Sequence, residues 1–160
     1  MSAGGPALAI TGAGGFLGSR LVADLVARGT SVRALVRQPV PWLGTEDQRV
    51  VELLDPASRI AEALEGLPAV VHLAGHNEVV AAADPDGALA ETALMGRHVI
   101  EAARTADVGR VVYVSTIHVY GDRLAPGATV DESAPPAPHG PYAVARLAVE
   151  HLVADGPDPV

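Results

Sequence analysis

Short apolar runs alternate along this chain with longer segments in which apolar residues recur every three or four positions. The runs predict strands, at residues 7–10, 31–36, 50–53, 69–73 and 110–114. The segments between them predict helices, at residues 16–28, 55–65, 86–106 and 141–154. Strands that alternate with helices favour a doubly wound, parallel α/β sheet of about five strands, in one domain over residues 1–160.

Several residues mark where these elements end. Gly29 is placed to cap the first helix, and Asp55 with Pro56 predicts an N-cap followed by the first helical residue of the second. The apolar face of the helix over 86–106 is wide, which suggests burial beyond a single sheet contact, such as a dimer interface. Residues 121–141 are rich in proline and glycine and predict an ordered loop.

Composition excludes several kinds of chemistry. The chain has no cysteine, so disulfides, zinc–thiolate sites and cysteine nucleophiles are excluded. All 11 basic residues are arginine, so a Schiff-base or P-loop lysine is excluded as well. The formal net charge of −8 disfavours nucleic acids and anionic membranes as partners. The six histidines lack the usual metal-ligand spacing, so no metal is expected.

Nothing in the chain predicts a membrane segment or an export signal. No apolar run reaches the roughly 18 residues that span a bilayer. Residues 1–6 lack a basic segment followed by an apolar one, so the expected location is the cytoplasm.

A glycine-rich turn joins the first strand to the first helix. Gly12 allows the tight turn, Gly15 allows the backbone to approach a diphosphate, and Gly18 allows close packing of helix on strand. The free N–H groups and positive end of the helix then hold the phosphates. A glycine-rich turn without a ligand is the alternative, and the strand–turn–helix context favours the dinucleotide site.

The turn resembles the Thr-Gly-x-x-Gly-x-x-Gly fingerprint of the extended short-chain dehydrogenase/reductase family, the group of nucleotide-sugar epimerases and dehydratases. Four further segments resemble the family in the same order and extend the match over nearly the whole chain. They are Glu52-Leu53-Leu54-Asp55-Pro56, residues 70–75 (Val-Val-His-Leu-Ala-Gly), residues 111–121 around Ser115-Thr116, and Pro141-Tyr142-Ala143-Val144-Ala145-Arg146.

The resemblance implies a set of site residues. Thr116 would orient the substrate oxygen, and Tyr142 would be the general acid/base, with Arg146 as its partner. The residues that would bind the cofactor are Gly12, Gly14, Gly15, Phe16, Leu17, Gly18, Arg37, Glu52, Leu53, Leu73, Ala74, Gly75, Tyr142 and Arg146. His72 is expected to pack in the core, whereas His76 and His118 are expected near the site.

Arg146 departs from the family pattern, which has a lysine at this position. Residues four apart share one helix face, so Arg146 is correctly placed beside Tyr142. A tyrosine with its ordinary pKa of about 10 needs a neighbouring positive charge, which arginine can supply. Arginine does not release a proton readily, so a proton relay through Arg146 is excluded. Loss of catalysis at this site is the alternative.

The end of the second strand favours NADP over NAD. NAD sites usually carry an acidic residue there for the ribose hydroxyls, and here Val36 is followed by Arg37. A guanidinium suits a 2′-phosphate because it binds phosphate through two donors. The alternative is that Arg37 is a solvated surface residue.

Two functions follow from these observations. The first is an NAD(P)-dependent oxidoreductase, epimerase or dehydratase acting on a hydroxyl or carbonyl of a small molecule, with a nucleotide sugar as one expected substrate. The second is a non-catalytic dinucleotide-binding module or one half of a split enzyme.

The resemblance also implies that family members are about twice this length, with a substrate-binding part that is absent here. The strand at 110–114 is therefore expected to be an open edge. Truncation is the favoured reason, because residues 156–160 resemble an interior loop. A split subunit, a homodimer through residues 89–103 and 141–154, or a partner chain over the edge are alternatives.

Overall fold

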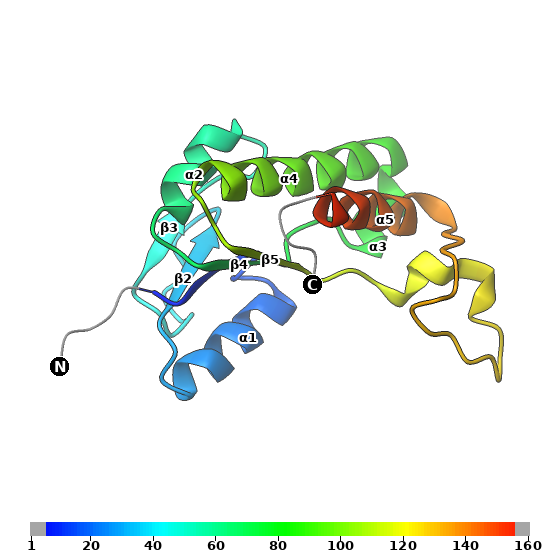
Figure 1. The fold of residues 1–160 in the computed structure, drawn as a ribbon, viewed down its shortest axis with the longest axis horizontal. Coiled ribbons are helices and arrows are strands. Elements are labelled where there is room, and N and C mark those ends of the chain that lie inside the picture. The colour runs from blue at the N-terminus through cyan, green and yellow to red at the C-terminus, as the bar shows by residue number, and fades with distance from the viewer. Residues whose placement is uncertain (1–5, 156–160) are drawn as a thin grey trace.

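Five parallel strands form the sheet of the structure, a computed structural model that describes residues 6–155 (Figure 1). Their order across the sheet is β3-β2-β1-β4-β5. The strands are β1 Leu8–Thr11, β2 Val32–Val36, β3 Gln48–Val50, β4 Ala69–His72 and β5 Arg110–Tyr113. The predicted doubly wound, five-stranded parallel sheet is thus confirmed.

Helices cover the two faces of this sheet. They are α1 Phe16–Ala27, α2 Ala57–Leu64, α3 Glu78–Ala83, α4 Pro85–Thr105, α5 Gly140–Ala154 and the 3₁₀ helix η1 Ile117–Arg123. Figure 1 shows α1 on one side of the sheet and α2, α4 and α5 on the other. Side chains alternate between two cores, since Ala9 and Val70 pack toward α2 and α4 while Ile10 and Val71 pack toward α1.

Several local predictions were wrong in detail. The third strand covers 48–50 instead of 50–53, because it pairs with β2 through Ala34, Leu35 and Val36. Asp55 is not the N-cap of α2, since Pro56 takes that position and the helix begins one residue later. The short helix α3 was not predicted, although the Asn77 side chain caps it by accepting from Val80 N at 3.0 Å. The segment expected to be only a loop begins inside η1.

The wide apolar face of α4 is explained within the chain, because α2 and α5 both pack against this helix. Gly96 permits the approach of α5, since a Cβ at this position would lie 2.6 Å from a methyl group of Val149. Arg104 of α4 also donates to the backbone oxygen of Asp155 at 3.1 Å. The predicted dimer through these two helices stays a prediction.

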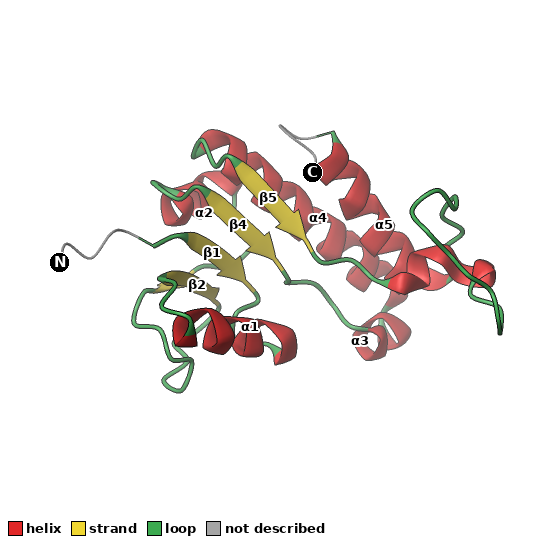
Figure 2. Cartoon of the chain, turned by 60° about the horizontal axis from the view of Figure 1, so that its bottom comes forward, coloured by secondary structure: helices red, strands yellow, loops and turns green. Residues whose placement is uncertain are grey.

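The expected open edge is confirmed at β5. In the sheet of residues 6–155, no strand pairs with its outer side (Figure 2). Val112 and Val114 are 43% and 38% exposed.

Among the described helices, none has both the length and the apolar character that crossing a membrane requires. The expectations for residues 1–5 and 156–160 lie outside the described residues.

Candidate dinucleotide-binding and catalytic site

The glycine turn after β1 is fixed by close backbone contacts. Gly12 has a φ of +67°, and a Cβ there would lie 2.9 Å from the backbone nitrogen of Ala74. A Cβ at Gly18 would lie 2.7 Å from the Cα of Ala13. The turn therefore packs directly on the end of β4, and the first turn of α1 packs directly on the turn.

The beginning of α1 presents free N–H groups at an open surface. Gly15 is the N-cap, and among the described residues no side chain caps this helix and no acidic residue lies in its first turn. The N–H groups of the first helical residues have no partner within a helix. Gly14 and Gly15 are exposed, and so are the side chains of Phe16 and Leu17. This end of the helix is not plugged, and its chemistry fits a diphosphate.

A cavity of about 470 Å³ extends from this turn to the end of β2. It is lined by Gly14, Gly15, Val36, Arg37, Gln38 and Val40. Val36 is buried, whereas Arg37 is exposed at the rim. Arg37 forms no ion pair with any residue of the described part of the chain. The structure thus places a free guanidinium in the same cavity as the glycine turn.

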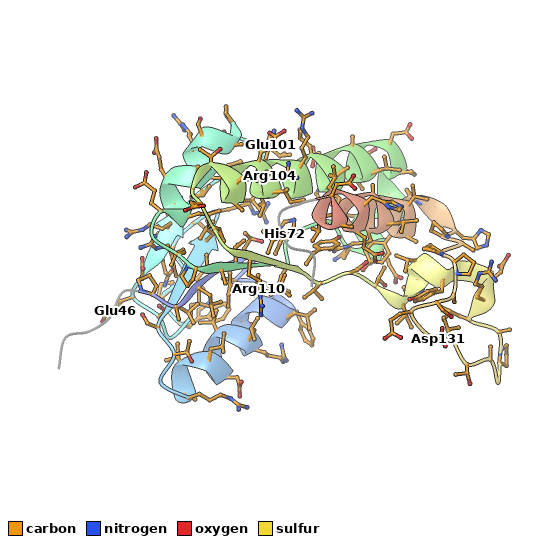
Figure 3. All side chains as sticks on the ribbon, in the orientation of Figure 1. Glu46, His72, Glu101, Arg104, Arg110 and Asp131 are labelled. Carbon is orange, nitrogen blue, oxygen red and sulfur yellow. The ribbon has the colours of Figure 1, made fainter. Side chains whose placement is uncertain are left out.

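Thr11 ties the ends of β1 and β4 together. Its hydroxyl oxygen accepts from the backbone N–H groups of Leu73 at 3.2 Å and Ala74 at 3.4 Å. The same oxygen lies 2.7 Å from Nδ1 of His72, which is fully buried on the α4 and α5 side of the sheet (Figure 3). Burial, and then the charge of Arg146, lower the pKa of His72 to about 3. The imidazole is therefore neutral, and its hydrogen bond with the Thr11 hydroxyl links the ends of β1 and β4.

Tyr142 and Arg146 lie one turn apart on α5 and face each other. The Arg146 Cζ is 5.3 Å from the centroid of the Tyr142 ring, and Arg146 is only 7% exposed. Its Nη2 donates to the backbone oxygen of His76 at 3.3 Å. A Cβ at Gly75, which has a φ of +147°, would lie 3.1 Å from the guanidinium. The end of β4 therefore joins the glycine turn to the tyrosine–arginine pair.

Thr116 lies at the N-cap of η1, the 3₁₀ helix that packs against α5. Its hydroxyl accepts from the backbone N–H of His118 at 3.3 Å. The ring of His118 meets that of Tyr142 edge-on, with centroids 6.2 Å apart, and its Nε2 lies 3.0 Å from the carboxylate of Glu78. The segment that carries Thr116 thus borders the face of α5 that carries Tyr142.

The side chains of Glu52 and Leu53 lie in different surroundings, one exposed and one buried. Glu52 is exposed and lines a hollow with Val51, Asp55 and Arg59. Leu53 is 7% exposed and packs in the core, where its backbone oxygen lies 3.0 Å from Nδ1 of His98. The roles of this pair and of the other predicted site residues stay predictions.

Sequence reasoning missed two contacts of the site. Tyr113 accepts a hydrogen bond from Nη1 of Arg146 at 3.3 Å, and no local pattern marks this residue of β5. His76 is held by Glu91, whose carboxylate lies 2.7 Å from Nε2, and by the Thr92 hydroxyl, 3.2 Å from its backbone nitrogen. The described residues contain no group of three or more metal-binding side chains.

The comparison with family models identifies the relatives of this chain. Residues 8–155 match the model described as "NAD dependent epimerase/dehydratase family". The chain belongs to this family. The glycine turn and the strand order of the sheet are thus those of a dinucleotide-binding fold.

The family contains curated relatives with several activities. The chain is 36% identical over 158 residues to the 4-hydroxy-2-methyl-3-oxo-4-farnesyl-3,4-dihydroquinoline-1-oxide ketoreductase of Stigmatella aurantiaca, covering 92% of the chain and 46% of that protein. It is 31% identical over 160 residues to the dTDP-glucose 4,6-dehydratase of Streptomyces niveus, covering 89% and 47%. The chain spans about half the length of these relatives.

Solved structures agree with this placement. MoeE5 in complex with UDP-glucose and NAD superposes with a TM-score of 0.80 at 32% identity, covering 91% of this chain and 47% of that one. The UDP-glucose 4-epimerase of Thermus thermophilus, in complex with NAD, gives 0.79 at 31% identity, covering 92% and 49%. Both of these structures contain NAD, and the second is described as an epimerase.

Proposed function

We propose that the protein is an NADP-dependent enzyme that reduces, oxidises, epimerises or dehydrates a small molecule at a hydroxyl or carbonyl carbon, with a nucleotide sugar as the expected substrate. One observation carries the proposal. The tyrosine–arginine pair of α5 packs on Gly75, directly after the strand whose end also closes the glycine turn. Phosphate-binding backbone and an acid/base side chain therefore border one strand end, as dinucleotide chemistry requires.

The glycine turn would hold the cofactor. The N–H groups that begin α1 bind the diphosphate, and Gly12 and Gly18 keep the turn tight enough for its backbone to approach the phosphates. A bound nicotinamide supplies the hydride acceptor or donor. Leu73, Ala74 and Gly75, directly after β4, are the residues that would hold it.

Three side chains would act on the substrate. Tyr142 moves the proton of the substrate hydroxyl, and Thr116 donates a hydrogen bond to the same oxygen. Arg146 supplies a fixed positive charge beside the Tyr142 ring. It takes no part in proton transfer, because a guanidinium keeps its proton at neutral pH.

The preference for NADP rests on Arg37. Its guanidinium borders the cavity that Gly14 and Gly15 line, and among the described residues no carboxylate pairs with it. It is thus available to a 2′-phosphate. We expect Arg37→Asp to weaken NADPH binding about tenfold or more relative to NADH, measured by nicotinamide fluorescence. Arg110→Asp, at another exposed arginine, is the matched control, and unchanged selectivity in Arg37→Asp would remove Arg37 from the site.

The activity is tested on UDP-glucose, dTDP-glucose and cinnamoyl-CoA, with nicotinamide absorbance and product chromatography as readouts. Cinnamoyl-CoA is included because the chain is 36% identical over 146 residues to the cinnamoyl-CoA reductase 1 of Petunia hybrida. Tyr142→Phe should lower kcat at least about a hundredfold, because it removes the proton donor. Tyr120→Phe, in η1, is the matched control and should leave kcat unchanged. Arg146→Lys should remain active. If wild type and Arg146→Lys are both inert in the full-length context while cofactor still binds, the enzyme assignment fails.

The open edge of β5 suggests a covering partner. We propose that further polypeptide, from a second copy or another chain, pairs with this strand, since unpaired edges invite pairing. The predicted homodimer through α4 and α5 is the alternative. Sedimentation of wild type and Val112→Lys separates them, because a charge on β5 should weaken only the edge contact. A cytoplasmic location stays a prediction.

A further inference from the structure

The far end of Arg146 is fixed by three residues, one on β5 and two in the loop after β4. Nη1 donates to the Tyr113 hydroxyl of β5 at 3.3 Å, and Nη2 donates to the His76 backbone oxygen at 3.3 Å. Gly75 adds a steric limit, since even a Cβ would approach the guanidinium to 3.1 Å. A planar guanidinium must be oriented as well as located, and these contacts set both its position and its plane.

The guanidinium lies near two phenol rings that differ in their bonding. Its Cζ is 6.0 Å from the centroid of the Tyr113 ring and 5.3 Å from that of Tyr142, both within the reach of a cation–π contact. Of the two tyrosine hydroxyls, only that of Tyr113 is hydrogen-bonded to Arg146. The bond to Tyr113 holds one edge of the guanidinium on β5 and leaves the Tyr142 hydroxyl available to substrate.

We propose that Tyr113 is a positioning residue matched to an arginine at 146: its hydroxyl anchors Nη1 so that the charge of Arg146 stays against Tyr142. The proposal rests on the proposed function. A lysine ammonium is a compact charge at the end of a flexible chain, so it does not need a second anchor to set its plane. The need for Tyr113 should therefore disappear when Arg146 is replaced by lysine.

Tyr113→Phe removes the hydroxyl oxygen that accepts the hydrogen bond from Arg146 and leaves the ring in place. The Tyr113 ring also packs on His72, with centroids 5.5 Å apart, and phenylalanine retains that contact. The titratable groups that face Arg146 and the two rings are His72 from β4, His76 from the following loop, His118 from η1 and Glu150 from α5. All of them remain in Tyr113→Phe, so a changed pH profile reports the lost anchor.

The Tyr113–Arg146 contact is tested first by a titration that requires no enzymatic activity. Burial raises the pKa of Tyr113, while the charge and hydrogen bond of Arg146 lower it. Arg146→Met should therefore shift the ionisation of Tyr113 to higher pH. The chain has three tyrosines, so phenolate absorbance measured with and without Tyr113→Phe isolates the signal of Tyr113. An unshifted Tyr113 in folded Arg146→Met would overturn the anchor.

The positioning role is tested by a double-mutant cycle in the whole protein, with the most active of the three substrates named above. With Arg146 present, Tyr113→Phe should lower kcat about tenfold, change KM less than about twofold and alter the pH profile of kcat. In Arg146→Lys, the same change should lower kcat less than about twofold. Tyr120→Phe is the control and should leave kcat unchanged in both backgrounds.

The outcomes separate this proposal from the proposed function. Equal losses from Tyr113→Phe with arginine and with lysine at 146 would show a general packing role and overturn the positioning role. Inert wild-type protein would overturn the proposed function and with it the catalytic part of the proposal. In that case the Tyr113 titration still decides whether this residue anchors Arg146.

Discussion

The β1–α1 turn and the β5–α5 region build their halves of the site differently. The turn is shaped by backbone contacts, in which Gly12 and Gly18 leave no room for a side chain. The β5–α5 region depends on side chains, since Tyr113, Tyr142 and Arg146 form its contacts. It also buries Oγ of Ser115 and Nε of Arg146 without a hydrogen-bond partner among residues 6–155.

The difference explains where this sequence keeps the family pattern and where it departs. A turn made by the backbone has no substitute for its glycines, and all of them are present. A charge delivered by a side chain can come from another residue if the neighbours reorganise around it. Arg146 stands where the resemblance leads us to expect a lysine, in the second region, where Tyr113 and the His76 backbone accept its hydrogens.

The largest effect is expected from a methyl group in the turn. Gly18→Ala forces a backbone shift, because its Cβ would lie 2.7 Å from Ala13 Cα. It should destabilise the protein by about 3 kcal/mol and abolish dinucleotide binding. Urea unfolding and calorimetry with NADPH measure the two effects. Gly109→Ala is the matched control, since its Cβ would make only an ordinary 3.5 Å contact; similar losses in both variants would refute a backbone-built turn.

The second effect comes from His72, which lies between the two regions. Its pKa falls to about 3 on folding, so the unfolded chain binds its proton at higher pH than the folded one. Stability is therefore lost as the pH falls below about 6.5, by roughly 1.4 kcal/mol per unit. At about pH 5 the loss should be about 2 kcal/mol.

His72→Gln should remove this part of the acid sensitivity, as measured by urea unfolding at a series of values between about pH 7 and about pH 4. His151→Gln, at an exposed position of α5, is the control. An unchanged slope in His72→Gln would show that His72 is not buried in its neutral form.

The smallest effects are expected from two valine substitutions, one in a central strand and one at the open edge. Val70 of β4 is fully buried, whereas Val112 of β5 is 43% exposed. Val70→Thr should reduce the free energy of unfolding by about 1.5 kcal/mol, since it buries a hydroxyl. Val112→Thr should change it by less than about 0.5 kcal/mol. Equal costs, measured by thermal unfolding at several protein concentrations, would identify a second copy of this chain, instead of a different chain, as the partner proposed for β5.

Much of this architecture could be predicted because it depends on short-range patterns in the sequence. The apolar runs predicted the five strands, and the glycine spacing identified the turn after β1. The limits of α2 and β3 were off by one to three residues because local signals for element ends are weak. The helix α3 was missed because six residues show too little periodicity.

The contacts that complete the site could not be predicted from local pattern. Tyr113 and Arg146 are 33 residues apart, and Thr11 and His72 are 61 apart. Their bonds arise only because the parallel sheet places β1, β4 and β5 side by side and α5 packs above them. The family resemblance located Tyr142 and Arg146, but it contained no information about which groups would accept the hydrogens of an arginine.

Direct titration of the protein with dinucleotide tests the central claim, that the N–H groups at the beginning of α1 and the Arg37 guanidinium bind NADP. Calorimetry with NADPH and then with NADH should show one site per chain, with NADPH bound about tenfold more tightly. Absence of binding heat with either dinucleotide, supported by an unchanged melting temperature, would contradict the account.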